Sequence, residues 1–322
     1  MLRLGNTVNA ARILGFGSTQ PEQVVTNDDL SKIMDTSDQW IRERVGIVER
    51  RFAAKDESAE DMAVVAGSNA LADAGLEPSD VDTVILANCT SMVPIPNYAA
   101  PVADRIGIKG AAAFDLNAAC AGFCYALGVA ADLVRGGSSG RVLVIGAEKL
   151  TDVVDPVDRA NAIIFADGAG AAVVGPSDEP GIGPVVWGSA GDLVDLIYMR
   201  DEKYIFQEGQ SVFRWATTQI APIALRALDA AGLQPSDVDV LVPHQANLRI
   251  VEAIAKRLRK AGAREDMVVA DDIVHSGNTS SASIPMAIDH MRAAGRIRSG
   301  DVTLIVGFGA GLSYAGQVVI CP

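Results

Sequence analysis

Apolar and polar positions along the chain form two alternating kinds of segment. Stretches with the length and period of helices occupy residues 58–74, 121–134, 211–231, 248–261 and 284–294. Short runs rich in Val, Ile and Leu, typical of strands, occupy residues 82–87, 112–116, 142–145, 171–174, 238–242, 302–306 and 317–320. This alternation predicts a layered α/β fold whose strands are covered on both faces. Residues 191–209 fit neither pattern, so we expect a loop there.

One nine-residue motif occurs twice. Residues 74–82 read AGLEPSDVD and residues 231–239 read AGLQPSDVD, with eight of nine positions identical. Each copy follows a predicted helix and precedes a predicted strand. A second pair of similar strings occurs in the same order, GRVLVI at 140–145 and GDVTLI at 300–305. We interpret the chain as two duplicated α/β halves, residues 1–175 and 176–322, related by a pseudo-twofold axis. The alternative is a coincidental helix–turn–strand pattern.

Composition narrows the class of protein. Apolar residues make up 49% of the 322 residues, enough for a sizeable core, yet no apolar run approaches the ~18–20 residues of a membrane helix. The net charge of −13 argues against nucleic-acid binding by the chain as a whole. Residues 1–19 contain no continuous apolar segment, so we expect no secretory signal. Four cysteines are too few for a disulfide framework, which predicts a reduced protein in the cytoplasm.

Three glycine-rich strings resemble known motifs but lack the required context. GGSSG at 136–140 lies between a predicted helix and a strand, the reverse of a hydrolase nucleophile elbow. GAGAAVVG at 168–175 leads into a strand, and GFGAG at 307–311 leaves only eleven residues for the helix and acidic residue of a dinucleotide site. The three histidines are scattered and no Cys/His pair has zinc spacing. We therefore expect neither a nicotinamide cofactor nor a metal.

Cys120 is the strongest candidate nucleophile. It follows the predicted strand at 112–116 and lies at the start of a predicted helix. The helix macrodipole and free backbone N–H groups at such a position favour the reactive thiolate. A buried, inert cysteine is the alternative, and Cys124 on the same helical face is an example.

Two polar residues in the second half also occupy ends of elements. His244 directly follows the strand at 238–242, and Asn278 lies in a loop before a helix. Ligands of α/β folds bind at the carboxyl ends of strands. A hydrogen-bonded loop histidine and a helix N-cap are the alternatives. A pseudo-twofold axis would bring both residues towards Cys120.

These residues lie in three strings: DLNAACAGF at 115–123, VPHQANLRI at 242–250 and HSGNTSSAS at 275–283. Their sequences, order and spacing resemble the catalytic segments of β-ketoacyl-acyl carrier protein synthase III, the initiating condensing enzyme. The resemblance extends from Ile13 to Val319 and implies a thiolase-like, five-layer αβαβα fold. The asparagine segment separates the chain from elongating ketosynthases, which use a second histidine, and from thiolases, which use a second cysteine.

The resemblance implies a decarboxylative Claisen condensation. Cys120 would take the acyl group from acyl-CoA, a substrate and not a tightly bound cofactor. His244 and Asn278 would donate hydrogen bonds to the thioester oxygen of malonyl-acyl carrier protein and stabilise the enolate left by loss of CO₂. Backbone N–H groups of Cys120 and of Ala310, beside Gly309, would form a second oxyanion hole, and Phe308 would exclude water.

Further roles follow from the resemblance. Residues implied in CoA binding are Trp40 and Arg159 around the adenine, Arg44 beside them, and Gly209 and Asn247 along the pantetheine channel. Val45 departs from a hydrogen-bonding Thr of some members. A basic helix face would bind the acidic carrier protein, although it could also be an ordinary solvated face. Its residues are Arg249, Lys256, Arg257 and Lys260, with Arg214 nearby.

The loop 88–97 resembles one that crosses the interface of a homodimer, where Ile95 would line the partner's acyl pocket in place of a bulky aromatic. We expect room for branched or longer starters. Two alternatives remain at this point: a priming ketosynthase of a polyketide pathway, and a degenerate acyl-CoA-binding protein. The intact set of Cys120, His244 and Asn278 argues against the second.

Overall fold

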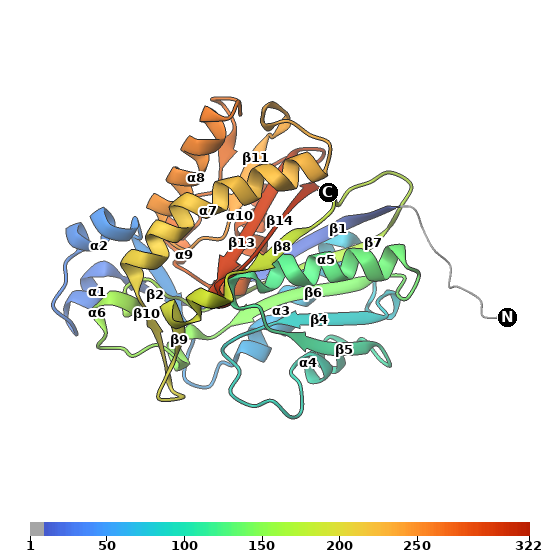
Figure 1. Ribbon diagram of the computed structural model, residues 1–322. Coiled ribbons are helices and arrows are strands. Elements are labelled where there is room, and N and C mark those ends of the chain that lie inside the picture. The colour runs from blue at the N-terminus through green and yellow to red at the C-terminus, as the bar shows by residue number, and fades with distance from the viewer. Residues whose placement is uncertain (1–9) are drawn as a thin grey trace.

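Two five-stranded sheets form the framework of the protein, whose computed structural model describes residues 10–322 (Figure 1). The first sheet has the order β1 (Ala10–Thr19), β7 (Gly168–Ser177), β6 (Val142–Glu148), β4 (Thr83–Ala87), β5 (Ala112–Leu116). The second has the order β8 (Val186–Ser189), β14 (Ser313–Ile320), β13 (Val302–Gly309), β11 (Val240–Pro243), β12 (Val268–Val269).

The two sheets have the same sequence of pairings. In the first sheet, β1, β7 and β6 pair antiparallel, while β6, β4 and β5 pair parallel. The second sheet repeats this pattern from β8 through β14 and β13 to β11 and β12. This correspondence is what a duplicated chain produces. β7 runs through Ser177, so the first sheet extends two residues past the boundary predicted between residues 175 and 176.

The helices and sheets form five layers, which confirms the predicted thiolase-like arrangement. Helices α5 (Gly122–Arg135) and α10 (Ser283–Ala293) lie between the sheets and share one apolar core with both. The outer face of the first sheet is covered by α3 (Ala59–Ala74) and α4 (Ala99–Ile106). The outer face of the second is covered by α7 (Gly209–Ala230) and α8 (Leu248–Lys260).

The repeated nine-residue motif makes the same local structure in both halves. It ends α3 and α7 at Gly75 and Gly232, whose φ values of +64° and +72° lie in the left-handed region that suits glycine. A short 3₁₀ turn follows, η1 (Pro78–Asp80) in one half and η5 (Pro235–Asp237) in the other. In each turn the aspartate accepts a hydrogen bond from the backbone N–H three residues earlier, at 2.9 Å and 2.8 Å.

A smaller subdomain flanks the sheets on the left of Figure 1. It contains the helices α1 (Asn27–Ser31), α2 (Asp38–Val45), α6 (Arg159–Ala162) and α9 (Ile273–Ser276) and the paired strands β2 (Gln23–Thr26) and β3 (Glu49–Phe52). Its apolar residues form a separate cluster around Ile41, Ile47 and Ile163.

The loop predicted at residues 191–209 is wrong in part. This segment contains the 3₁₀ turn η4 (Gly191–Leu196) and an antiparallel pair, β9 (Ile197–Arg200) and β10 (Tyr204–Gln207), and α7 already begins at Gly209. Met199 and Ile205 pack on the cluster of the flanking subdomain, and Ile205 N–H donates to the carbonyl of Val153. These contacts with distant residues stabilise the hairpin, and the short local pattern does not reveal them.

Two properties of residues 10–322 bear on the expected class of protein. No helix there is long and apolar enough to cross a membrane. The same residues include no group of three or more His, Cys, Asp or Glu side chains placed to hold a metal ion. The nine residues before Ala10, including Arg3, lie outside the described part.

Candidate active site

Cys120 lies in the turn η2 (Ala119–Ala121), between β5 and α5, as predicted. Ala119 has a φ of +47°, a strained value that costs on the order of 1 kcal/mol and is typical of functional turns. Gly309 at the end of β13 packs directly on this turn, since a Cβ there would lie 2.8 Å from Cβ of Cys120. Only glycine permits this approach, which brings the 307–311 loop of the second half onto the nucleophile.

Burial raises the pKa of the Cys120 thiol to about 12, and the nearby Glu148 charge raises it further, while the Ser280 side chain and the backbone N–H of Cys120 lower it. Burial therefore opposes the thiolate that the helix N-terminus favours. Cys124 is fully buried, as its alternative reading predicted.

His244 follows β11 and is buried with 2% exposure. Burial lowers its pKa to about 3, so the imidazole is neutral. Its Nδ1 lies 2.7 Å from Oγ of Ser283, and this hydroxyl oxygen also accepts the N–H of Gln245 at 3.3 Å. In the tautomer in which the Ser283 hydroxyl donates to Nδ1, the ring proton lies on Nε2 and this nitrogen is a donor. The ring of Phe308 packs against His244 at 5.3 Å between centroids.

Asn278 is held in place by its own backbone. Its N–H donates to the carbonyl of Ile164 and its carbonyl accepts from Ala166, both at 2.9 Å. Its side-chain oxygen accepts the N–H of Ser280 at 2.8 Å. That bond orients the amide, so the NH₂ group is the end left to donate to a substrate.

The structure thus brings the candidate residues of both halves into one network. Gly309 touches Cys120, and the adjacent Phe308 touches His244. The turn η6 (Ser280–Ala282), whose Ser280 N–H donates to the side chain of Asn278, packs against the turn η2 that holds Cys120. Ala310 begins the turn η7 (Ala310–Leu312) that follows Gly309. One nucleophile and two uncharged hydrogen-bond donors suit acyl transfer coupled to enolate stabilisation.

The residues implied in adenine binding also lie together. Trp40 on α2 has the guanidinium of Arg159 at 4.7 Å and that of Arg44 at 5.0 Å from its ring centroid. Since Arg159 is already in stacking distance, an adenine between it and Trp40 requires the arginine to move aside. Arg159 also donates to the backbone carbonyl of Asp35 at 2.7 Å. The Val45 side chain faces the core with 2% exposure and makes no polar contact.

Asn247 joins α8 to the adenine-binding candidates. Its side chain caps α8 by accepting the N–H of Arg249 at 3.0 Å and donates to the carbonyl of Arg44 at 3.4 Å. Gly209, at the first residue of α7, is exposed, with open space around its Cα.

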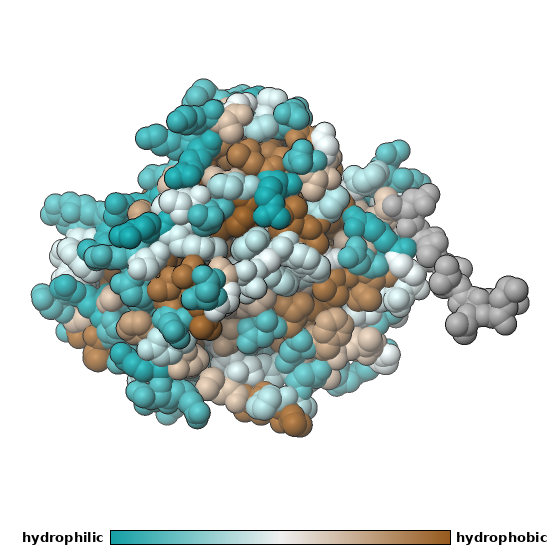
Figure 2. Space-filling view, viewed as in Figure 1, coloured by the Kyte–Doolittle hydropathy of each residue, from teal (hydrophilic) through white to brown (hydrophobic). Residues whose placement is uncertain are grey.

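The basic face of α8 is exposed next to this region. Ile250, Val251, Ile254 and Leu258 are buried, as the helical period predicts. Hydrophilic side chains cover α8 at the upper left of Figure 2. The exposed basic residues are Arg249, Lys256, Arg257 and Lys260, with Arg214 on the adjacent α7.

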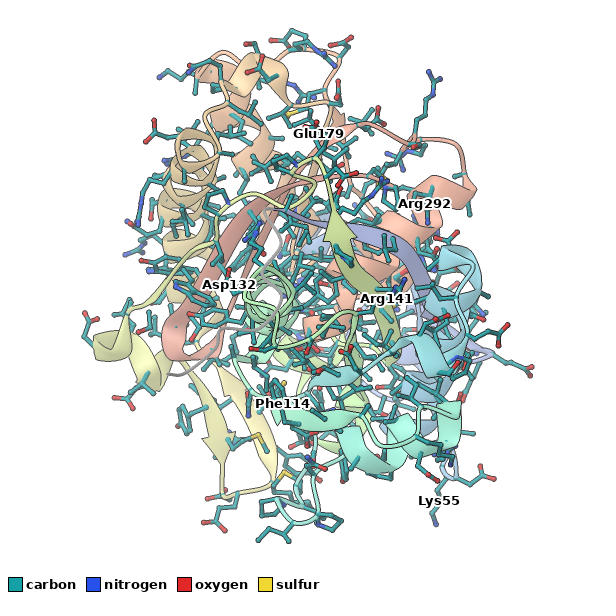
Figure 3. The ribbon with its side chains drawn as sticks, turned by 90° about the vertical axis from the view of Figure 1, so that its right-hand side faces the viewer. Lys55, Phe114, Asp132, Arg141, Glu179 and Arg292 are labelled. Atoms are coloured by element: carbon teal, nitrogen blue, oxygen red, sulfur yellow. The ribbon has the colours of Figure 1, made fainter. Side chains whose placement is uncertain are left out.

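An apolar surface lies at the far edge of the first sheet. β5 is an edge strand with three of its five residues exposed, among them Phe114 at 36% (Figure 3). Beside it, the loop before α4 exposes Val93 at 51% and Ile95 at 84%. Ile95 therefore lines no pocket of its own chain.

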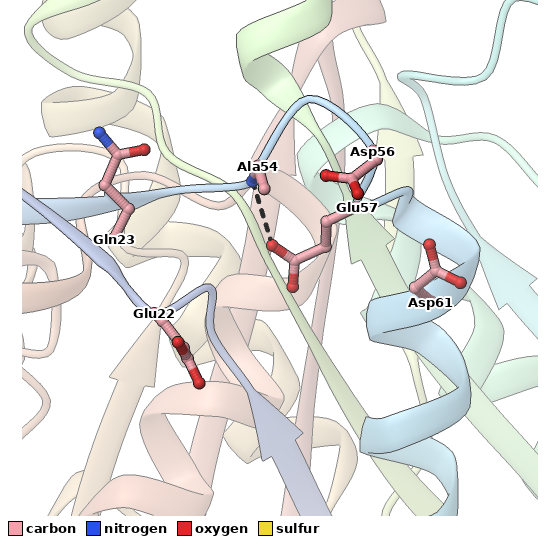
Figure 4. Close-up of a pocket in the computed structure, with 6 residues that line it drawn as sticks. All are labelled: Glu22, Gln23, Ala54, Asp56, Glu57 and Asp61. Atoms are coloured by element: carbon pink, nitrogen blue, oxygen red, sulfur yellow. Dashed lines mark hydrogen bonds between the residues drawn. The ribbon is translucent and has the colours of Figure 1, made fainter.

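A hollow of about 690 Å³ lies elsewhere, between β2, the loop after β3 and α3 (Figure 4). Its polar lining is acidic, with Glu22, Asp56, Glu57 and Asp61, and none of the candidate site residues lines it. Such a surface repels the phosphates of CoA and an acidic protein.

Two polar residues of the network have no counterpart among the sequence predictions. Ser283, which orients His244, lies in a serine-rich run that gave no specific signal. Glu148 is fully buried at the end of β6, where it bonds Ser280 and Ser281. These two serines lie more than a hundred residues away in sequence, so no local motif identifies Glu148.

Comparisons with known proteins agree with this geometry. Family models described as 3-oxoacyl-[acyl-carrier-protein] synthase III and its C-terminal region match residues 114–191 and 228–321. The chain is 51% identical to a β-ketoacyl-[acyl-carrier-protein] synthase III of Streptomyces coelicolor over 97% of this chain and 99% of that protein. It is 49% identical to a mycobacterial β-ketoacyl-[acyl-carrier-protein] synthase III of Mycobacterium avium, over 96% and 95% of the two chains.

Solved structures show the same likeness. The priming β-ketosynthase of the R1128 polyketide pathway matches with a TM-score of 0.95 and 42% identity, over 100% of this chain and 98% of that one. A 3-oxoacyl-[acyl-carrier-protein] synthase III of Aquifex aeolicus matches with a TM-score of 0.92 and 38% identity, over 97% and 100%. The chain therefore belongs to the 3-oxoacyl-[acyl-carrier-protein] synthase III family, the acyltransferases that perform the initiating condensation of fatty acid synthesis.

Proposed function

We propose that this chain condenses an acyl-CoA starter with malonyl-acyl carrier protein to give a 3-oxoacyl-acyl carrier protein. In the first half reaction Cys120 takes the acyl group and CoA leaves as its thiol. Backbone N–H groups of Cys120 and Ala310 hold the carbonyl oxygen during this transfer. The close packing of Gly309 on Cys120 supports this assignment.

In the second half reaction His244 and Asn278 stabilise the enolate formed by loss of CO₂. The observation that carries this proposal is the orientation of two uncharged donors: Nδ1 of His244 is bonded to Ser283, and the amide oxygen of Asn278 is bonded to Ser280. Nε2–H and the amide NH₂ are therefore the free ends. Phe308 packs on the imidazole and helps exclude water. The enolate carbon then attacks the acyl-Cys120 carbonyl.

Both substrates would approach the same side of the molecule. Trp40, Arg44 and Arg159 bind the nucleotide of CoA, while Asn247 and Gly209 line the path of the pantetheine. The basic face of α8 binds the acidic carrier protein, because a local positive patch on a chain of net charge −13 attracts an acidic partner selectively. The hydrogen bond from the Asn247 side chain to the carbonyl of Arg44 on α2 supports two neighbouring binding regions.

The exposed edge strand β5 and the loop before α4 support a homodimer. Pairing of two β5 strands would cover Phe114 and bring Ile95 to the partner's acyl pocket. An isoleucine there leaves room for a branched or longer starter. The cytoplasmic location stays a prediction.

A starter panel tests the proposal. Incubation with each acyl-CoA should leave one acyl group on Cys120, detected by mass spectrometry of the intact chain and its peptides, and none on Cys120→Ala. Subsequent addition of malonyl-acyl carrier protein should yield the 3-oxoacyl product. No adduct from any acyl-CoA in the panel would contradict the proposal. A strong preference for acetyl-CoA over isobutyryl-CoA would contradict only the assignment of Ile95.

The likeness to a priming β-ketosynthase favours a second candidate, the priming step of a polyketide pathway. The chemistry at Cys120 is the same for both. Competition between a fatty-acid and a polyketide carrier protein for the acylated chain separates them, because the true acceptor gives the higher kcat/KM.

A further inference from the structure

The side chain of Asn278 is held by a turn that is itself strained. Its amide oxygen accepts the N–H of Ser280 at 2.8 Å, and this bond leaves the NH₂ group free to donate. Ser280 has a φ of +51°, a left-handed conformation that costs free energy in a residue with a Cβ. Such a conformation persists only where the surrounding contacts hold it. The position of the Asn278 amide therefore depends on what holds η6.

Glu148, at the end of β6 in the first half, holds this turn by hydrogen bonds. The Oγ atoms of Ser280 and Ser281 lie 3.1 Å and 2.7 Å from its Oε1. All three side chains are buried, with 0% exposure for Glu148 and 1% for each serine. Water cannot replace a lost bond there, and a buried polar group without a partner is costly. We propose that Glu148 is a positioning residue that holds η6, and through Ser280 the amide of Asn278, in the geometry that enolate stabilisation requires.

The other carboxylate oxygen fixes Glu148 itself. Its Oε2 accepts the backbone N–H of Cys89 at 3.0 Å, the backbone N–H of Thr90 at 3.1 Å and the Thr90 hydroxyl at 3.0 Å. Thr90 is held in turn, because its Oγ1 accepts the backbone N–H of Lys149 at 3.2 Å. The carboxylate cannot rotate without losing these donors. The bridge therefore runs from the backbone after β4, through one carboxylate, to the turn beside Asn278.

Backbone packing brings η6 within reach of this carboxylate. Gly146 lies two residues before Glu148 on β6, so the two positions face the same side of the sheet. A Cβ at Gly146 would lie 2.6 Å from the carbonyl oxygen of Ser281, so glycine is what lets the turn pack directly on the strand. The Oγ of Ser281 also lies 3.0 Å from the carbonyl oxygen of Ala87 on β4. One strand thus supplies both the space for η6 and the acceptor that fixes it.

A double-mutant cycle between Glu148 and Asn278 tests the positioning role, which rests on the proposed decarboxylation of malonyl-acyl carrier protein. Glu148→Met fills nearly the same space but removes the hydrogen bonds to η6. Release of ¹⁴CO₂ should slow by about tenfold to hundredfold, the usual cost of moving a reacting group by ~1 Å, while acylation of Cys120 stays near the wild-type rate. In an Asn278→Ala background the same substitution should change CO₂ release by less than about twofold, because the group that it displaces is already absent. An equal loss in both half reactions, or an undiminished loss without Asn278, would overturn the inference.

Glu148→Gln separates positioning from charge. Its amide oxygen can accept the N–H groups of Cys89 and Thr90, while its NH₂ group donates to the serine hydroxyls, which also act as acceptors. This variant should therefore recover most of the rate that Glu148→Met loses. A Glu148→Gln variant as slow as Glu148→Met would contradict the bridge, because the negative charge would then be what the reaction needs.

Ser281→Ala keeps the test decisive if Glu148→Met does not fold. It removes the 2.7 Å bond and leaves the carboxylate in place, so CO₂ release should fall about three- to tenfold, again only when Asn278 is present. Thr83→Val is the matched control, because it breaks a buried 2.6 Å hydrogen bond to Ser139 at the opposite end of β4. It should lower stability but leave CO₂ release unchanged. A loss of CO₂ release in the control equal to that in Ser281→Ala would also overturn the inference.

Hydrogen exchange, followed by mass spectrometry, reports on the bridge without the reaction. Peptides that cover residues 88–91 and 278–283 should exchange faster in Glu148→Met than in the wild type, and Thr83→Val should leave both peptides unchanged. Unchanged exchange of the second peptide in Glu148→Met, or in Ser281→Ala if the first variant does not fold, would overturn the inference. Absence of CO₂ release in the wild type would contradict the proposed function alone, because exchange of these peptides still tests the bridge.

Discussion

The two halves of the molecule share a framework but differ at equivalent turns. η2 (Ala119–Ala121) precedes α5 in the first half, and η6 (Ser280–Ala282) precedes α10 in the second. Both turns contain a non-glycine residue with positive φ, Ala119 at +47° and Ser280 at +51°. The backbone strain is thus duplicated along with the sheets, which indicates that the turn geometry belongs to the framework.

The side chains on these turns differ in chemistry. η2 presents a thiol, whereas η6 presents hydroxyl groups and follows the amide of Asn278. The ends of the equivalent strands β4 and β11 also differ, since Ala87 occupies the place in the first half that His244 occupies in the second when counted from the repeated motif. One half therefore supplies the nucleophile and the other supplies the donors. Duplication of a framework followed by divergence at its turns is sufficient to build a two-step active site.

Among the residues of the second half, Asn278 should cause the largest loss of decarboxylation rate when it is replaced. Asn278→Ala removes one of two hydrogen bonds to the enolate oxygen, which lowers the rate of malonyl-acyl carrier protein decarboxylation about 10²–10³-fold. Release of ¹⁴CO₂ from labelled malonyl-acyl carrier protein measures it. Asn278→Asp keeps the size but loses the NH₂ group, so it should not restore the rate. A decarboxylation rate within threefold of wild type in either variant would exclude the donor role.

Because His244 is neutral in the folded state, the free energy of unfolding should depend on pH. Its pKa rises from about 3 in the folded state to 6.5 on unfolding, so only the unfolded chain binds this proton between those values. The contribution to the free energy of unfolding is complete above pH 6.5 and falls by about 1.4 kcal/mol per pH unit below it. Denaturant unfolding of wild type and His244→Gln at several pH values gives the difference. A difference that stays constant below pH 6.5 would show that His244 is protonated in the folded state.

Replacement of Ser283 should reduce the decarboxylation rate less than replacement of Asn278. Ser283→Ala removes the hydrogen bond to Nδ1 and with it the preference for hydrogen on Nε2, a loss of about 1–1.5 kcal/mol or roughly tenfold in decarboxylation rate. Acylation of Cys120 should be unchanged in this variant. An equal decrease in both half reactions would indicate a general disturbance of α10 instead of an altered tautomer.

The smallest effect concerns the basic face of α8, which we propose binds the carrier protein. Arg249→Glu should raise KM for malonyl-acyl carrier protein about five- to tenfold and leave KM for acyl-CoA unchanged, because an exposed charge contributes modestly to association. Steady-state kinetics at two ionic strengths provide the measurement, with Arg226→Glu on α7 as a charge-matched control. Equal changes in both KM values would contradict carrier-protein binding at Arg249.

Local patterns predicted the longer elements of the two halves well. The five helices and seven strands expected from apolar period all occur, because each has its own hydrophobic face and the nine-residue repeat fixes their order. β1 was not predicted, since Gly15 and Gly17 obscure its strand pattern. These glycines are required by a distant contact: a Cβ at Gly17 would lie 2.2 Å from the backbone nitrogen of Ala70 on α3.

Local patterns also miss those residues of the active site whose roles depend on distant contacts. The sequence identified Cys120, His244 and Asn278, because each directly follows or precedes a predicted element in a distinctive string. Glu148 and Ser283 have ordinary local contexts, and their importance comes from partners brought near by the fold. The raised pKa of the Cys120 thiol was also beyond local reasoning, since its main cause is burial by residues that only the fold brings near.

We assign the nucleophile to the first half of the chain and the hydrogen-bond donors to the second half. Two variants measured in both half reactions test this assignment most directly. Cys120→Ala and Asn278→Ala are each assayed for acyl adduct formation from acyl-CoA and for CO₂ release from malonyl-acyl carrier protein. The structure predicts a crossed result: Cys120→Ala forms no adduct but still releases CO₂, and Asn278→Ala forms the adduct at nearly the wild-type rate but releases CO₂ slowly. Loss of both activities in both correctly folded variants would contradict the separate assignment of nucleophile and donors.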